Sequence, residues 1–416
     1  MTQIHASELP IDEIPAFPTQ RSCPFHPPEE YAEHRQSDAP VRVSLLSGRI
    51  AWLVTVHDQV RQVLASPDVS SDRGHDNFPA RFPQNNEEIK QRFRQFRPSL
   101  IGVDPPFHTK LRRSVITEFT VRRTKELRPR IQEIVDASID DLLEAGKDGA
   151  PVDLVEKVSL PVPSMVICEL LGVPYADHDF FQDRTSRLIS MNRSPEEGIQ
   201  AFQDLGDYFV DLVGRKEKAP TDDLIGRLIT SGRENGDYDA EELVGLSQLL
   251  LIAGHETTAN MISLGTVALL DDPEQLRSLR EDPDTLMPTA VEELLRFFTI
   301  ADSVTSRTAT ADMEVGGVTI RAGEGIIASG LAANRDPNAY SDPDTLDITR
   351  NARNHVAFGY GVHQCLGQNL ARMELDIVYR TLFDRVPTLT LAVEAESLPY
   401  KHEALVFGIR EVPVTW

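Results

Sequence analysis

The sequence predicts a mainly α-helical fold with a minor β region, organised as a single domain over residues 1–416. Apolar residues recur at helical spacing through much of the chain, and the pattern from Glu241 to Leu270 is apolar through much of its length, as in a central buried helix. β-type patterns are confined to short segments. Although the length alone would suggest two or three domains, no internal repeat or low-complexity linker divides the chain.

The N-terminal part of the chain predicts irregular structure followed by one β-hairpin. The first forty residues are rich in proline, and we expect them to wrap the surface without a regular element. Two β patterns follow, Val41 to Leu45 and Ala51 to Thr55, and the intervening Ser47-Gly48-Arg49 is typical of a hairpin turn. The stretch from Ser71 to Pro98 is polar and long for a loop, which favours a functional segment such as a lid.

Helical patterns dominate the middle of the chain. Apolar residues from Ile131 to Leu143 share one helical face before Gly146, and similar patterns cover Ser164 to Leu171 and Ala201 to Val213. Late β patterns return at Met313 to Ile320, around a Gly-Gly turn, and again near the C-terminus.

Composition and charge favour a soluble protein that binds neither membranes nor nucleic acid. Hydrophobic residues make up 40% of the chain and charged residues 26%, which is typical of a globular core. The N-terminus has no signal-peptide pattern, and no apolar span has membrane length, so we expect a cytoplasmic protein. The formal net charge of -23 disfavours nucleic acid and anionic membranes as partners.

One segment departs from this acidic balance and is called the basic island here. Such a cluster is either a solvated helix face or a docking site for an acidic partner. Its members are Lys110, Arg112, Arg113, Arg122, Arg123, Lys125, Arg128 and Arg130.

The most informative segment is Phe358-Gly359-Tyr360-Gly361-Val362-His363-Gln364-Cys365-Leu366-Gly367. It places Cys365 among three glycines at the start of a helical pattern, where free N–H groups would stabilise a thiolate. Such a thiolate suits a metal ligand or a nucleophile. A buried structural cysteine and a phosphate-binding loop are the alternatives, but the segment lacks a P-loop lysine and a GxGxxG pattern.

The cysteine count narrows the choice of metal. Structural zinc needs about four ligands, whereas Cys23, Cys168 and Cys365 lie far apart with no CxxC pair. Haem iron needs only one protein ligand, and a thiolate in that place favours cleavage of an O–O bond. The segment FGxGxHxCLG resembles the haem-ligand signature of the cytochrome P-450 monooxygenases. This resemblance implies haem b (heme b, iron protoporphyrin IX) with Cys365 as the metal ligand and Phe358 and Gly359 in contact with the cofactor.

A second motif lies within the predicted central helix, at Ala253-Gly254-His255-Glu256-Thr257-Thr258. An acid and two threonines are costly in an apolar helix unless they serve a pocket, and Gly254 suggests a bulge in the helix. The structural alternative is a threonine that bonds the carbonyl one turn back, at Ala253. The motif matches the family's oxygen-activation pattern, and the resemblance implies that Glu256 and Thr257 are catalytic and manage protons.

A third motif, Glu293-Leu294-Leu295-Arg296, places an acid and an arginine on one helix face. Alone, it would be read as a surface pair. It matches the family's ExxR motif, which implies a structural role in holding the haem-ligand region.

Haem propionates need charge-assisted donors, and family-matching positions supply them. The resemblance assigns this cofactor-binding role to His108, Arg112, Arg307 and His363. Ordered motifs agree from Asp104-Pro105-Pro106 to Ala371-Arg372, and the chain looks closest to soluble actinobacterial enzymes of the streptomycete type.

The expected function is hydroxylation: insertion of one oxygen atom from O2 into a C–H bond of a hydrophobic small molecule such as a macrolide, a sterol-like compound or a xenobiotic. The chain carries no dinucleotide fingerprint and no iron–sulfur cysteine cluster, so electrons must come from a partner. The resemblance suggests ferredoxin and ferredoxin reductase, with docking at the basic island. We expect a monomer.

Three other functions are alternatives: a haem carrier or gas sensor, a peroxide-using or isomerising haem-thiolate enzyme, and a helical interaction protein without cofactor. The proton-handling pair Glu256-Thr257 disfavours a sensor. The expected pocket walls are mixed in polarity, with Arg73 and Arg193 able to meet a polar edge of the substrate. These walls are residues 73–100, 188–195, the central helix, 299–304 and 404–406.

Overall fold

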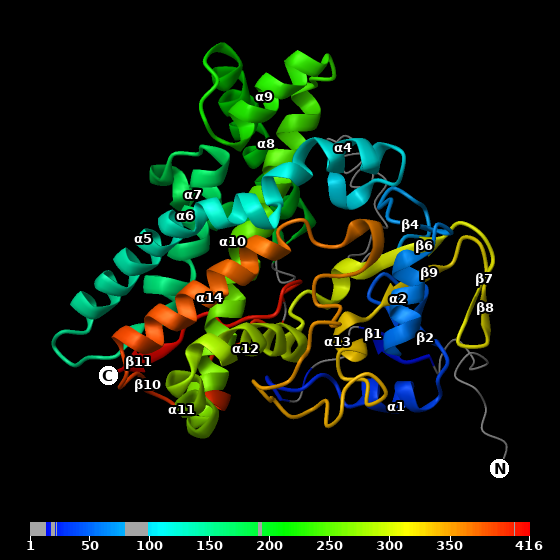
Figure 1. The fold of residues 1–416 in the computed structure, drawn as a ribbon. Coiled ribbons are helices and arrows are strands. Elements are labelled where there is room, and N and C mark those ends of the chain that lie inside the picture. The colour runs from blue at the N-terminus through cyan, green and yellow to red at the C-terminus, as the bar shows by residue number, and fades with distance from the viewer. Residues whose placement is uncertain (1–13, 18–20, 22, 80–98, 190–193, 403) are drawn as a thin grey trace.

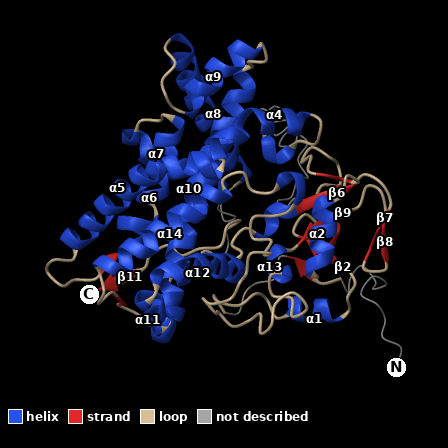
Figure 2. Ribbon diagram, viewed as in Figure 1, coloured by secondary structure: helices blue, strands red, loops and turns tan. Residues whose placement is uncertain are grey.

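A computed structural model describes residues 14–17, 21, 23–79, 99–189, 194–402 and 404–416. Helices fill one side of the molecule, and the strands gather mainly on the other side (Figures 1 and 2). The fold is therefore mainly α with a minor β region, as predicted. The helices are α1 Glu30–Gln36, α2 His57–Ala65, α4 Phe107–Val115, α5 Val121–Ala145, α6 Pro161–Leu171, α7 His178–Ile189, α8 Pro195–Lys218, α9 Leu224–Asn235, α10 Ala240–Asp271, α11 Pro273–Glu281, α12 Pro283–Phe298, α13 Gly330–Ala333 and α14 Gln368–Arg385.

The largest sheet is mixed and joins segments that are distant in the chain. The predicted hairpin forms its core, where Val41 pairs with Leu53 and Arg42 with Trp52. The second hairpin strand then pairs in parallel with a strand more than 270 residues later, with Trp52 opposite Ile326. The strand order is β1 (Ala16–Phe17), β2 (Val41–Leu45), β3 (Ile50–Val54), β9 (Gly325–Ala328), β6 (Ser306–Ala309) and β4 (Val69–Ser70).

Two smaller sheets complete the β region. The predicted late hairpin is confirmed as β7 (Met313–Val315) and β8 (Val318–Ile320), with Gly316 and Gly317 at positive φ in the turn. The third sheet ties the C-terminus to the middle of the chain, because β11 (Pro413–Thr415) lies between β10 (Thr390–Leu391) and β5 (Val152–Asp153).

Helix α10 is the central element of the helical side, as its apolar sequence predicts. The Asp239 side chain accepts hydrogen bonds from the backbone N–H groups of Glu241 and Glu242 and so starts the helix. The helix then packs against α6, α8 and α14, which bury most of its surface (Figure 1). Among the described residues, no helix combines the length and the apolar character needed to span a bilayer.

The prediction for the first forty residues was partly wrong. Residues 30–36 form α1, and residues 16–17 form β1, which pairs in parallel with β2. Both elements depend on tertiary contacts: Tyr31 is buried, and β1 is held by a neighbouring strand. Most of the expected lid, residues 80–98, lies outside the described residues, as does Arg193.

Candidate functional site

The cysteine loop runs between a short helical turn, Gly361–His363, and the start of α14. The Cys365 backbone N–H donates to the Phe358 carbonyl at 2.8 Å, which closes the loop. Gly359 and Gly361 adopt φ of 69° and 73°, a left-handed conformation that favours glycine. At Gly361 a Cβ atom would lie 2.3 Å from the Leu64 carbonyl oxygen, so α2 can approach only a glycine there.

The Cys365 thiol lies at the N-terminus of α14, as the sequence predicts. Burial raises the pKa of Cys365, whereas hydrogen bonds from the Gly367 and Gln368 N–H groups and the charges of Arg112 and Arg372 work to lower it. These donors and cations are the environment that a thiolate needs once a metal cation draws off the proton.

Cys168 offers no comparable site. Cys168 is buried, and desolvation raises its pKa to about 12, which makes it an inert structural thiol. In the described part of the chain, no cluster of three or more His, Cys, Asp or Glu side chains could hold a metal ion. The surroundings of Cys365 in the described residues are compatible with a porphyrin, which brings its own nitrogen ligands.

Helix α10 presents Thr257 and Ala253 on an accessible face. The Thr257 hydroxyl donates to the Ala253 carbonyl at 2.7 Å. This is the purely structural role expected of a threonine that bonds the carbonyl one turn back. The bulge expected at Gly254 was wrong, because the helix is α-helical throughout. Gly254 instead allows close packing of α6: a Cβ atom there would lie 3.0 Å from the Ile167 side chain.

Glu256 lies on a different, buried face of the same helix. Its Oε1 accepts a hydrogen bond from Lys401 Nζ at 2.6 Å, and the same ammonium donates to Asn260 Oδ1 at 3.0 Å. Lys401 comes from a loop near the C-terminus. Nothing in the local sequence marks this lysine, so sequence reasoning missed it.

The four residues assigned to the propionates come together, although they belong to three elements. His108 and Arg112 are on α4, Arg307 is on β6, and His363 is in the cysteine loop. The rings of His108 and His363 lie 4.1 Å apart between centroids. Arg112 Nη2 donates to the Gln364 carbonyl at 2.7 Å, which links α4 to the cysteine loop.

This cluster holds more positive charge than the described residues neutralise. Burial lowers the pKa of Arg307 to about 10, and burial together with Arg307 and His108 lowers the pKa of His363 to about 3. The His108 Nε2 atom is buried without a hydrogen-bond partner. Asp104, the nearby carboxylate, already accepts from Ser70 Oγ and the Ser71 N–H.

A dianionic ligand would satisfy these groups, and haem b carries two carboxylates. The Cys365 thiol at a helix N-terminus, a set of unneutralised donors and a glycine-lined loop therefore all fit haem b.

Glu293 and Arg296 form a fully buried pair on α12, so the alternative of a surface pair is excluded. Arg296 Nε and Nη2 donate to the two carboxylate oxygens at 2.7 and 2.8 Å. Arg296 Nη1 also donates to the carbonyls of Asn334 and Pro343. The pair thus ties α12 to the segment that leads into the cysteine loop.

A second buried network adjoins the cysteine loop and was not predicted. Glu292 accepts from Arg372 Nε at 2.6 Å and contacts His355 Nε2 at 3.0 Å. Although burial acts in the opposite direction, the hydrogen bonds from His355 and Arg372 lower the pKa of Glu292 to about 2. The Arg372 guanidinium lies 4.6 Å from the centroid of the Phe358 ring, so the network supports the loop that carries Cys365.

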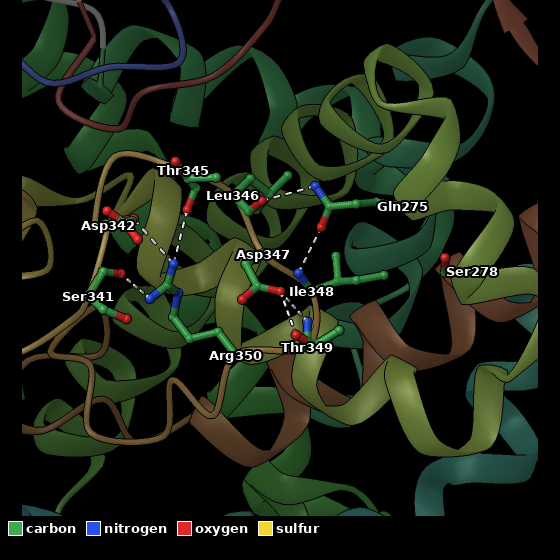
Figure 3. Close-up of a pocket in the computed structure, with 10 residues that line it drawn as sticks. All are labelled: Gln275, Ser278, Ser341, Asp342, Thr345, Leu346, Asp347, Ile348, Thr349 and Arg350. Atoms are coloured by element: carbon green, nitrogen blue, oxygen red, sulfur yellow. Dashed lines mark hydrogen bonds between the residues drawn. The ribbon is translucent and has the colours of Figure 1, made fainter.

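A surface hollow of about 420 Å³ lies beside the Arg296 network (Figure 3). Its polar groups are largely bonded to one another: Arg350 donates to the carbonyls of Ser341 and Asp342, and Gln275 bonds the backbone at Leu346 and Ile348. The hollow is therefore a seam between packed segments, away from Cys365.

The structure neutralises most of the basic island. Lys110 pairs with Glu242, Arg123 with Glu118 and Glu126, Arg128 with Asp376, and Arg130 with Glu133 and Glu169. Arg113 and Lys125 remain exposed and have no ion-pair partner in the ranges that the structure describes.

The structure describes several residues of the expected pocket walls, and their role in lining one substrate pocket stays a prediction. Leu100 is buried, Val304 is accessible, and Ile300 accepts a backbone hydrogen bond from Phe407 at 2.9 Å. Arg73 lies against Gly102, and its charge contributes to the lowered pKa of Arg307, so it lies near the propionate donors.

Comparisons with known proteins agree with this site. The sequence profile of the cytochrome P-450 family matches residues 214–407. The chain is 50% identical to the vitamin D3 dihydroxylase of Streptomyces griseolus over 97% of each chain. The crystal structure of cytochrome P-450 MoxA from Nonomuraea recticatena superposes with a TM-score of 0.88 at 53% identity, covering 96% of this chain and 98% of that one.

A relative with a bound ligand shares the same fold. The mycinamicin VIII C21 methyl hydroxylase MycCI of Micromonospora griseorubida, bound to mycinamicin VIII, has a TM-score of 0.89 at 41% identity, with 97% and 100% of the two chains covered. With full-length relatives at this identity and the thiol and donor cluster in place, the chain belongs to the cytochrome P-450 family of haem b monooxygenases.

Proposed function

We propose that Cys365 is the residue that would hold the haem iron and that the enzyme hydroxylates a hydrophobic small molecule. The observation that carries this proposal is the Cys365 thiol at the N-terminus of α14, facing the N–H groups of Gly367 and Gln368 and near the charge of Arg112. When bound, haem b supplies the oxygen chemistry, by which one atom of O2 enters a C–H bond and the other leaves as water.

The residues around Cys365 hold the cofactor. His108, Arg112, Arg307 and His363 supply charge and N–H groups to the propionates, and the unpartnered His108 Nε2 supports this role. Phe358 and Gly359 shape the loop behind the ligand. A competition experiment tests the role of the donors: Arg307→Met should release haem to a haem acceptor faster than the wild type does.

Thr257 and Glu256 supply protons. The Thr257 hydroxyl donates a hydrogen bond to the Ala253 carbonyl oxygen. The lone pairs of the hydroxyl oxygen can therefore accept a hydrogen bond from a water in the accessible space. Glu256, the residue that precedes Thr257, exchanges protons with the protein interior. Thr257→Ala and Glu256→Gln should each send electrons into peroxide instead of product, and unchanged product yield would contradict these roles.

The substrate is expected to have a hydrophobic skeleton with a polar edge. Related enzymes act on vitamin D3 and on mycinamicin VIII, which are both large apolar molecules with oxygen functions. In this chain, Leu100 and Ile300 would face the skeleton, and Arg73 would meet the polar edge. Macrolides, sterol-like compounds and xenobiotics should be screened by their shift of the haem absorption band; a panel without any hit would contradict this substrate class.

The electron donor is expected to be an acidic ferredoxin, supplied by ferredoxin reductase. Arg113 and Lys125 are exposed cations, and the neighbouring Ile116 and Val121 are 40% and 56% exposed, which gives a basic surface with apolar centres. Arg113→Glu should slow ferredoxin-driven reduction and weaken its dependence on salt. Arg130→Glu, at a cation already paired with two carboxylates, is the matched control.

An assay of turnover with ferredoxin and reductase also distinguishes a monooxygenase from a peroxide-using enzyme. A monooxygenase should turn over with ferredoxin, reductase and O2, whereas a peroxide-using enzyme would need peroxide only. We also propose that the enzyme is a cytoplasmic monomer, which light scattering of the purified holoenzyme can test.

A further inference from the structure

The loop that carries Lys401 rests directly on the face of α10 that contains Glu256. Lys401 N–H donates to the Gly408 carbonyl at 2.8 Å, which closes the loop, and a Cβ atom at Gly408 would lie 2.0 Å from Asn260 Oδ1. The loop backbone therefore touches the helix one turn beyond Glu256. The same loop contacts the expected pocket wall, through the bond from Phe407 N–H to Ile300.

The Lys401–Glu256 ion pair is buried, unlike most ion pairs of this chain. The Lys401 and Glu256 side chains are 12% and 9% exposed, and their N···O distance is 2.6 Å. Glu256 and Asn260 are four residues apart and share one helix face, so a single ammonium bridges both. The loop does not need this bridge for closure, because its own backbone bonds and the Gly408 contact already seat it on α10.

One buried donor at this site has no protein partner. Asn260 is 1% exposed, its Oδ1 accepts from Lys401, and its Nδ2 has no hydrogen-bond partner among the described residues. Buried amide donors of this kind are commonly satisfied by water. The cluster of Glu256, Lys401 and Asn260 thus contains one buried amide donor that the described residues leave without a partner.

We propose that Lys401 is a positioning residue for proton delivery: it holds the Glu256 carboxylate in one orientation beside α10, at the point where the C-terminal loop meets the helix. The inference rests on the proposed role of Glu256. Without the ammonium, the carboxylate would be buried and unpaired, so it would turn to another partner and leave this place. Proton delivery would then be slower than the release of reduced oxygen. O2 would take up two electrons and two protons and leave as hydrogen peroxide, without forming product.

Four variants of the holoenzyme test the proposal: Lys401→Met, Lys401→Arg, Glu256→Gln and the double variant Lys401→Met/Glu256→Gln. Lys157→Met is the matched control, because Lys157 forms an ion pair of the same 2.6 Å length with Glu156 on the surface. Each variant is assayed for the ratio of peroxide to product, the solvent isotope effect on turnover, and the substrate dissociation constant from the haem band. Should Lys401→Met not take up haem, Lys401→Gln replaces it.

Lys401→Met should raise the peroxide-to-product ratio on the order of tenfold and increase the solvent isotope effect, with the substrate dissociation constant unchanged. Lys401→Arg should restore most of the coupling, Lys157→Met should match the wild type, and the double variant should be no worse than Glu256→Gln. Thermal unfolding of the four proteins of the cycle should show coupling between positions 256 and 401, which is a readout independent of turnover.

Two results distinguish a failure of the inference about Lys401 from a failure of the proposed role of Glu256. If Glu256→Gln uncouples the enzyme but Lys401→Met does not, or if the two effects add in the double variant, the inference about Lys401 is wrong and the role of Glu256 stands. If Glu256→Gln keeps wild-type coupling, the proposed role of Glu256 fails and the inference fails with it.

Discussion

Replacing Glu293 by glutamine is expected to destabilise the protein strongly and to lower its haem content. Glu293 and Arg296 are both 0% exposed, and the carboxylate also accepts from Arg350 Nε at 3.1 Å and from the Asp347 N–H at 3.0 Å. The variant leaves two guanidinium groups beside a neutral amide in a buried place. Breaking such a pair costs about 3–5 kcal/mol, which is a large part of a typical unfolding free energy of roughly 5–15 kcal/mol.

Denaturant unfolding of the purified variant measures this loss, and the ratio of haem to protein absorbance measures cofactor content. Asp312→Asn is the control, because the Asp312–Arg321 pair has a similar length but is exposed, and it should change neither quantity. A loss of less than about 1 kcal/mol for Glu293→Gln, the range of surface pairs, would refute the reasoning.

Two further predictions concern buried charge. Glu374 is buried without a partner for Oε2, and desolvation raises its pKa from 4.5 to about 8. The native state therefore keeps a proton that the unfolded chain releases, so stability should fall as pH rises from about 4.5 to 8. Between pH 5 and pH 9 the wild type should lose about 4 kcal/mol of unfolding free energy through this group, and Glu374→Gln should not show this loss. The same pH dependence in both proteins would contradict the prediction. Arg307→Met should speed haem transfer to an acceptor protein on the order of tenfold, while Arg321→Met on the exposed late hairpin should not, and equal rates would remove Arg307 from the propionate set.

Local sequence patterns predicted the elements whose formation depends on neighbouring residues. Alternating apolar residues predict the hairpin at residues 41–54, and apolar residues at helical spacing predict the central helix α10. The glycines of the cysteine loop predict a backbone with positive φ, which the structure shows. The place of Cys365 before α14 was also predictable, because glycines and the helical pattern adjoin it in the chain.

Contacts between distant segments could not be predicted in the same way. The Lys401–Glu256 pair joins residues 145 positions apart, and the pairing of β3 with β9 joins strands far apart in the chain. Gly254 shows how tertiary packing overrides a local expectation: the pattern suggested a bulge, whereas the glycine admits Ile167 of α6.

The basic island illustrates the same limit for charge. Counting residues along the chain suggested a continuous basic surface, but Glu169, Glu242 and Asp376 come from other elements and pair with its members. Only the fold reveals which cations remain exposed for a partner. Arg113 and Lys125 are the exposed members for which the described residues offer no counter-ion.

The central claim, that Cys365 carries the haem iron, is tested most directly by the absorption spectrum of the reduced carbon monoxide complex. The wild type should show the band of a thiolate-bound haem. Cys365→Ser should lose that band, whereas Cys168→Ser, at a buried thiol whose pKa is raised by desolvation, should keep it. Retention of the thiolate band in Cys365→Ser would contradict the assignment.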